Sequence, residues 1–273
     1  MTHPWSDLRW WNSGERQAAE EKIDDLFERG IACSPSKGLL YKALSATPER
    51  EVRVAIIGQD PYPSTEMATG VAFSVPRTVA RADYPHTLKI IFGEYTKDLG
   101  LPSPTSGDLS RWTEQGVLLW NSIPCCKAGQ PLSCDWDEWG YLTREIITRL
   151  SDRGIVFALL GNVAARNESL INPRNNRIIR TSHPSPRGIR ASKTPFTGSR
   201  LFSTINARLR EVGRGSVDWE LKDEEFKPGD IGQGYIPPTG VVRGNVLPNI
   251  TGADLGGLKR QATSPNIYTS LLF

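Results

Sequence analysis

Residues 58–63, GQDPYP, combine side chains that could do chemistry with an unusually stiff backbone. Asp60 and Tyr62 stand beside Pro61 and Pro63, and each proline fixes its own φ angle. A carboxylate that is held still can act as a general base for water, or as a fixed negative charge facing a developing cation. An aspartate in a turn more often only accepts hydrogen bonds from nearby backbone, so this loop alone does not decide between the two roles.

Three further side chains could take part in such chemistry. Asn121 ends the apolar run GVLLWN, and its amide offers donors and an acceptor in one plane, which suits the edge of a base. His183 opens the segment HPSP, where a neutral imidazole could donate to a developing oxyanion. Phe73 and Tyr62 could form the walls of a pocket. Each has an ordinary alternative, as a loop cap, a surface histidine or a core aromatic.

The elements that must position these residues follow from the hydrophobic pattern. Four short apolar runs have the length and composition of buried strands, at residues 52–58, 116–121, 154–161 and 176–183. Segments with helical spacing lie before and between them, at 16–30, 87–100, 135–154 and 162–170. Strands that alternate with helices indicate βαβ units. We therefore predict an α/β/α sandwich with a central four-stranded, mostly parallel sheet flanked by helices.

Each of the four runs ends in polar residues. In open α/β sheets, the binding site lies outside the carboxyl ends of the strands. We therefore expect a set of side chains that are distant in sequence to converge there: Asp60, Tyr62, Asn121, Asn162, His183 and Ser185.

Several other classes of protein lack support. There is no GxSxG, Walker A, HExxH or GxGxxG pattern, and the four cysteines contain no CxxC pair. Three histidines without a His–Cys cluster argue against a zinc deaminase. We expect reduced thiols, no metal and no cofactor. No apolar run could span a bilayer, and the charged, Trp-rich N-terminus does not resemble a signal peptide.

The charge of the chain is concentrated in one segment. The net charge is only +3, but residues 172–210 contain eight arginines, one lysine and no acidic residue. A local block of one sign suits contact with phosphate, although a solvated basic loop would have the same composition.

The C-terminal part has a different composition. Residues 228–273 include 13 glycines and prolines among 46 residues and show no sustained period. We predict one domain at 1–225, with an N-terminal helical extension, and a draped or flexible Gly/Pro-rich extension at 226–273. We expect a monomer, located in the cytoplasm of a bacterial or viral system, or in the nucleus of a eukaryote.

Taken together, GQDPY, GVAFSV, GDLSRWTEQGVLLWN and HPSP resemble the motifs of family 1 uracil-DNA glycosylases in order and spacing, from about residue 35 to Trp219. The resemblance implies the fold of that family and a metal-independent hydrolase. Such an enzyme extrudes a nucleotide from DNA, cleaves the bond between uracil and deoxyribose, and so initiates base excision repair. It also implies single- and double-stranded DNA containing uracil as the partner, with a proteinaceous inhibitor or a replication protein as further candidates.

The resemblance also implies roles for residues of the pocket. Asp60 matches the carboxylate that activates water and stabilises the cationic sugar, and His183 matches the histidine that donates to uracil O2. Asn121 matches the residue that reads the uracil edge. Phe73 matches the ring that stacks on uracil, and Tyr62 the wall that excludes thymine. In addition, Gln59 matches a residue whose backbone amide contacts the base.

On the DNA side, Thr87, Asn162 and Ser185 match positions whose amides and hydroxyls contact phosphates, and the basic segment adds Arg190. Two positions depart from the family. Pro63 replaces the histidine of GQDPYH, and Arg187 replaces a leucine that fills the gap left by the extruded base. Arg187 could fill that gap itself, which we favour, or Ile189 could act as a displaced apolar wedge. These departures leave open an alternative function, a catalytically weakened DNA-binding or replication scaffold protein of the same fold.

Overall fold

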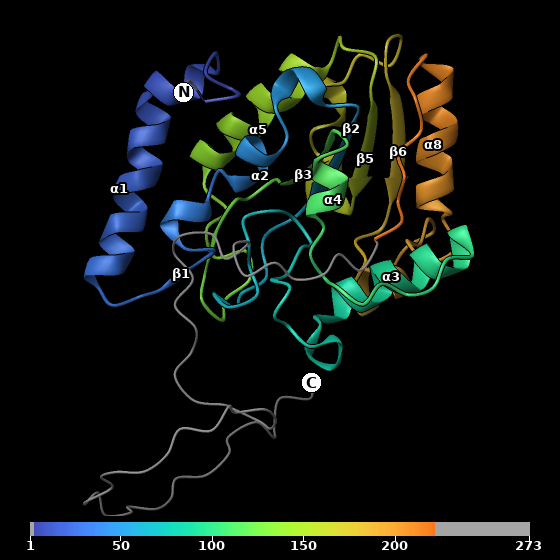
Figure 1. Ribbon diagram of the computed structural model, residues 1–273. Helices are drawn as coiled ribbons and strands as arrows, with labels where there is room; N and C mark the ends of the chain where they lie inside the picture. The colour runs from blue at the N-terminus through green and yellow to red at the C-terminus, as the bar shows by residue number, and fades with distance from the viewer. Residues whose placement is uncertain (1–2, 222–273) are drawn as a thin grey trace, which may run out of the picture. The chain divides into compact units, whose positions relative to one another are not determined.

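The computed structural model describes residues 3–221 (Figure 1). Its centre is a four-stranded sheet in which all neighbouring strands are parallel, in the order β3-β2-β5-β6. The strands are β2 (Val54–Gly58), β3 (Val117–Asn121), β5 (Val156–Leu160) and β6 (Arg177–Thr181). All four predicted strands are present, so the predicted α/β class and the four-stranded sheet are confirmed.

The helices cover both faces of this sheet (Figure 1). The α-helices of the described range are α1 (Gly14–Glu28), α2 (Lys42–Ala46), α3 (His86–Leu99), α4 (Ser110–Thr113), α5 (Asp137–Leu150), α6 (Asn162–Ala165), α7 (Pro186–Arg190) and α8 (Leu201–Glu211). One core lies between the sheet and the layer that contains α1, α2 and α5, and the other lies under α3, α4 and α8.

The strands supply both cores because successive side chains point to opposite faces. On β2, Ala55 and Ile57 belong to the first core, while Val54 and Ile56 belong to the second. Such a strand is apolar along its whole length, which is why the runs of β2, β3 and β5 read as continuous, whereas the edge strand β6 carries two arginines.

The long helices form where apolar residues recur at helical spacing. Helix α1 buries Ala19, Ile23 and Leu26, and it begins at Ser13, whose hydroxyl accepts a hydrogen bond from the Arg16 amide. Helix α3 ends at Gly100, whose φ of +69° is the left-handed conformation that glycine favours at a helix end.

The segment after the basic loop is fixed by a buried carboxylate. Glu94 of α3 is 2% exposed, and its two oxygens accept hydrogen bonds from the amides of Gly198 (2.6 Å) and Arg200 (2.7 Å). Arg200 is the residue that precedes α8, so this contact satisfies amides at the start of that helix.

Several features were not predicted from the sequence, among them helix α8, which packs on the second core. Residues 3–12 are held in the first core by Trp5 and Trp10, both fully buried, and the Trp5 indole donates to the Thr47 carbonyl oxygen at 2.9 Å. A short antiparallel pair, β1 (Cys33–Ser34) with β4 (Cys126–Lys127), lies outside the main sheet. The predicted extension at 226–273 lies outside the described residues. Within 3–221, no helix is long and apolar enough to cross a bilayer.

Candidate active site

The ends of β2 and β3 are fastened to each other where the polar loops begin. Gly58 and Asn121 are paired in the parallel register. Beyond them, the amide and the hydroxyl of Ser122 both donate to the Gly58 carbonyl oxygen, at 3.1 and 3.0 Å. The Ile123 amide donates to the Gln59 carbonyl oxygen at 2.9 Å. The loop that carries Asp60 therefore leaves the sheet in a fixed direction.

The Asp60 carboxylate is held by two donors. One oxygen, Oδ2, accepts a hydrogen bond from the Leu132 backbone amide at 2.7 Å, and Oδ1 accepts one from Gln59 Nε2 at 3.1 Å. The adjoining backbone is also fixed, because Ser34 Oγ donates to the Tyr62 carbonyl oxygen and the Gly129 amide donates to that of Pro63, both at 2.7 Å. Asp60 therefore does more than hold its own turn, since one of its partners, Leu132, lies 72 positions away in the chain.

Gly58 leaves room for two side chains of the site. A Cβ on Gly58 would lie 2.6 Å from Asn121 Oδ1 and 2.8 Å from Phe73 Cζ. Asn121 Oδ1 is buried and has no hydrogen-bond partner among the described residues. A buried acceptor without a partner is costly, so this oxygen is suited to a donor on a bound ligand.

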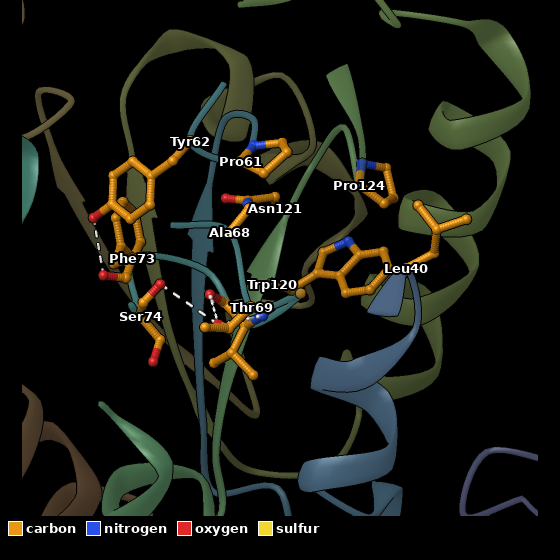
Figure 2. A pocket seen from close by; sticks show the side chains of 12 residues that line it. Leu40, Pro61, Tyr62, Ala68, Thr69, Phe73, Ser74, Trp120, Asn121 and Pro124 are labelled. Atoms are coloured by element: carbon orange, nitrogen blue, oxygen red, sulfur yellow. Dashed lines mark hydrogen bonds between the residues drawn. The ribbon is translucent and has the colours of Figure 1, made fainter. Parts of the chain in front are cut away.

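A pocket lies beside these residues, and Figure 2 shows Tyr62, Phe73 and Asn121 along it. The Tyr62 hydroxyl donates to the Phe73 carbonyl oxygen at 2.9 Å, and burial raises the pKa of this phenol far above its usual range. The other residues that line the pocket come from several parts of the chain: Leu40, Pro61, Ala68, Thr69, Gly70, Val71, Ser74, Trp120 and Pro124. Neither Asp60 nor His183 lines this pocket.

His183 stands at the end of β6, near the Phe73 ring. The two ring centroids are 6.4 Å apart, and a Cβ on Gly161 would lie 2.9 Å from the His183 Cβ. Burial lowers the pKa of His183, while the negative charge of Asp60 acts in the opposite direction. The imidazole is therefore neutral at neutral pH, which makes it a donor at one ring nitrogen only.

The predicted phosphate-contact residues lie at or near the starts of three helices. Ser185 precedes the short helix α7, and its hydroxyl accepts from the Gly188 amide at 3.2 Å. Arg187 and Arg190 on α7 are exposed, whereas Ile189 packs partly buried against the second core. Asn162 is the first residue of α6 and is exposed, and Thr87 is the second residue of α3.

Comparison with known proteins gives a consistent result. A model of the "Uracil DNA glycosylase superfamily" matches residues 44–210. The chain is 38% identical over 194 residues to a uracil-DNA glycosylase of Campylobacter lari, covering 70% of this chain and 82% of the relative. It is 40% identical over 192 residues to the Coxiella burnetii enzyme of that name, covering 70% and 81%.

The chain belongs to the uracil-DNA glycosylase superfamily. Its fold also matches the crystal structure of mimivirus uracil-DNA glycosylase, with a TM-score of 0.70 at 24% identity, over 80% of this chain and 86% of that one. A variant of the mimivirus protein, in complex with UGI, gives a TM-score of 0.71 at 24% identity, over 81% and 89%.

The basic segment of this glycosylase is only partly available to DNA. Four of its arginines lie within ion-pair distance of acidic residues: Arg177 and Arg208 with Glu211, Arg180 with Glu168, and Arg200 with Asp98. Within residues 3–221, no acidic side chain lies within ion-pair distance of Arg187, Arg190 or Lys193. Arg187, Arg190 and Lys193 therefore leave a cluster of unpaired positive charge on and next to α7, and Arg174 and Arg210 are the other basic residues of the segment without an ion pair in the described range.

Sequence reasoning missed two contributors to this glycosylase site. Gly58 matters because of the space it leaves, and Leu132 because its backbone amide holds Asp60. No periodicity marks either residue, because one acts by lacking a side chain and the other through the main chain. The four cysteines are buried and form no disulfide, and no cluster in the described range could hold a metal ion.

Proposed function

We propose that this glycosylase hydrolyses the N-glycosidic bond of deoxyuridine in single- and double-stranded DNA, releasing uracil, leaving an abasic site and initiating base excision repair. The observation that carries the proposal is one arrangement. A fixed carboxylate (Asp60), a neutral, partly buried histidine (His183) and an unpartnered amide oxygen (Asn121) lie at or just beyond the carboxyl ends of three strands of the sheet. The activity of the superfamily on DNA supports it.

The chemistry follows from the charge that develops as the bond breaks. The sugar becomes cationic and uracil becomes anionic. A fixed negative group is therefore needed beside the sugar, and a hydrogen-bond donor is needed beside the base. Asp60 faces the sugar, stabilises its positive charge and accepts a proton from the attacking water. His183, which is neutral, donates a hydrogen bond to uracil O2. Because both groups are held before substrate arrives, little reorganisation is needed during the reaction.

Uracil recognition uses the residues around Gly58. Asn121 pairs with the polar edge of uracil, its buried Oδ1 accepting the N3 hydrogen and its amide nitrogen donating to O4. Phe73 stacks on the base, and the Gln59 backbone amide contacts it. Tyr62 excludes a 5-methyl group, so thymine is rejected by steric conflict.

On the DNA strand, we place Thr87, Asn162 and Ser185 at phosphates and Arg187 with Arg190 at the backbone next to the extruded nucleotide. Arg187 rather than Ile189 fills the gap in the duplex, because Arg187 is exposed while Ile189 packs on the core. Pro63, where the resemblance expects histidine, is fixed by the Gly129 amide and leaves the water site with one polar side chain fewer.

The remaining proposals concern the whole protein. Residues 1–225 form the catalytic domain and 226–273 an extension. The chain acts as a monomer in the cytoplasm, without metal or cofactor. A proteinaceous inhibitor or a replication protein is a further partner, and a variant of the mimivirus enzyme has been solved in complex with UGI.

An oligonucleotide assay tests this function. Purified protein is incubated, in the presence of EDTA, with labelled single- and double-stranded oligonucleotides that contain one uracil, and abasic sites are then cleaved with alkali. We expect cleavage at the uracil position in both substrates and none in a matched thymine control. DNA binding without cleavage would instead indicate the weakened scaffold protein.

A further inference from the structure

One exposed apolar residue stands directly beside the Asp60 carboxylate. Within residues 3–221, only Phe27 and Leu132 are large hydrophobic residues with exposed side chains, at 44% and 42%. Phe27 lies on α1. Leu132 lies at the site, because its own amide donates to Asp60 Oδ2 at 2.7 Å. Its Cβ is only two bonds from that amide nitrogen.

The backbone of Leu132 is in a conformation that leucine rarely adopts. Its φ is +61°, in the left-handed region that favours glycine and asparagine. In the described part of the chain only two other non-glycine residues have positive φ, Phe73 and Arg200. Phe73 lines the pocket, and strained residues cluster at functional sites where the surrounding structure holds them in place.

The surrounding hydrogen bonds hold this conformation on both sides. The Gly129 amide donates to the Pro63 carbonyl oxygen, and Ser133 Oγ accepts from the Lys127 amide, both at 2.7 Å. Ser133 Oγ in turn donates to the Gln130 carbonyl oxygen at 2.6 Å, and Cys134 is fully buried. Residues 127–134 therefore form a rigid loop, which presents the Leu132 side chain to solvent at a fixed position.

We propose that the Leu132 side chain binds DNA, packing against the sugar or base next to the extruded nucleotide. This inference rests on the proposed function, in which the reacting sugar lies against Asp60. A leucine whose amide holds that carboxylate is then within reach of the adjoining nucleotide. The side chain is exposed on a backbone of unfavourable conformation, and covering the side chain with DNA removes its contact with water.

Two substitutions test the side chain without removing the amide. Leu132→Asn and Leu132→Gly both introduce residues that accept positive φ, and both keep the N–H that holds Asp60. We expect KM for a uracil-containing duplex, and Kd for the same duplex by fluorescence anisotropy, to rise about tenfold, which corresponds to about 1.4 kcal/mol. We expect kcat to change by less than about twofold and the thermal midpoint to stay equal or rise. Leu132→Met should retain the wild-type KM.

The matched control is Phe27→Asn, which removes a side chain of similar exposure from a residue that is not among the described hydrogen-bond partners of Asp60, and we expect no change in KM or Kd. The inference fails if Leu132→Asn and Leu132→Gly bind DNA as the wild type does, if kcat falls while KM is unchanged, or if Phe27→Asn weakens binding equally. Failure of the proposed function is a separate result. A wild-type protein that binds the duplex but releases no uracil would contradict that function, while the Kd comparison would still decide the role of Leu132.

Discussion

The hydroxyl of Tyr62 donates a hydrogen bond to the carbonyl oxygen of Phe73 at 2.9 Å, so the two aromatic residues of the pocket are joined (Figure 2). Tyr62 comes from the stiff loop after β2, and Phe73 lies eleven residues later with a φ of +68°. The wall that would reject a methyl group therefore also fixes the backbone of the ring that would stack on the base.

Replacing Tyr62 separates these two tasks. In Tyr62→Ala the wall is lost, and we expect detectable thymine release together with a fall of about tenfold in kcat/KM for uracil. Tyr62→Phe keeps the ring but loses the hydrogen bond, so it should still reject thymine. Base release from matched uracil and thymine oligonucleotides measures both effects. Thymine release by Tyr62→Phe, or none by Tyr62→Ala, would contradict the steric role.

Gly58 should not tolerate a methyl group. In Gly58→Ala the new Cβ would lie 2.6 Å from Asn121 Oδ1, so Asn121 or Phe73 must move. Because a displacement of about 1 Å can cost about 10²-fold in rate, we expect kcat/KM for uracil release to fall by about that factor. Gly93→Ala is the control, since a Cβ there meets nothing within 4 Å. Equal activity of the two variants would show that Asn121 and Phe73 do not need the space.

The protonation state of His183 should determine how kcat depends on pH. Burial lowers the pKa of His183 from 6.5, so the folded state favours the neutral imidazole. If the neutral ring is the donor, kcat should not rise as the pH falls through 6.5. His183→Ala should lower kcat by about 10²–10³-fold. A wild-type rate that increases below pH 6.5 would instead indicate a protonated histidine as the acid.

The lowered pKa of His183 also affects the free energy of unfolding, and the direction of this effect follows from which state binds the proton more tightly. Below pH 6.5 the unfolded chain binds a proton at His183 more readily than the folded protein does, so His183 lowers the free energy of unfolding as the pH falls. The thermal midpoint of His183→Gln should therefore decline less than that of the wild type between neutral pH and about pH 5. An equal decline in both proteins would show that His183 titrates normally.

Arg187 and Arg177 differ in whether their positive charge is available to DNA. Arg187 is exposed on α7 without an ion-pair partner in the described range, whereas Arg177 contacts Glu211 at 2.8 Å. Arg187→Ala should weaken duplex binding and reduce the slope of log K against log salt by about 0.9, as expected for one phosphate contact. Arg177→Ala should leave the slope unchanged. Anisotropy titrations at several salt concentrations distinguish these outcomes, and equal slopes for Arg187→Ala and wild type would exclude a phosphate contact.

The sequence predicted the sheet because three of its strands, β2, β3 and β5, are buried on both faces and read as continuous apolar runs. The topology rule for open sheets then predicted that Asp60, Asn121 and His183 would meet, and the structure places all three at the carboxyl end of the sheet. Helix α3 was predicted within one residue at each end, because a glycine in the left-handed conformation marks its end, whereas helix α8 was not predicted.

Other features depend on contacts between segments that local pattern does not encode. The Leu132 amide reaches Asp60 across 72 positions of the chain, and hydrogen bonds through the main chain do not depend on residue type. The ion pairs of Arg177 and Arg180 with Glu211 and Glu168 join acids outside the basic segment to arginines inside it. Charge counted along the sequence therefore overstated the charge available to DNA.

The most direct test of the account is the single-turnover rate of uracil release by Asp60→Asn. Asparagine keeps an oxygen that can accept the Leu132 amide, so the variant should fold with the thermal midpoint of the wild type. It lacks the negative charge that faces the sugar, so we expect the rate to fall by about 10³-fold. Release by a folded Asp60→Asn protein at a rate close to that of the wild type would contradict the central role of this carboxylate.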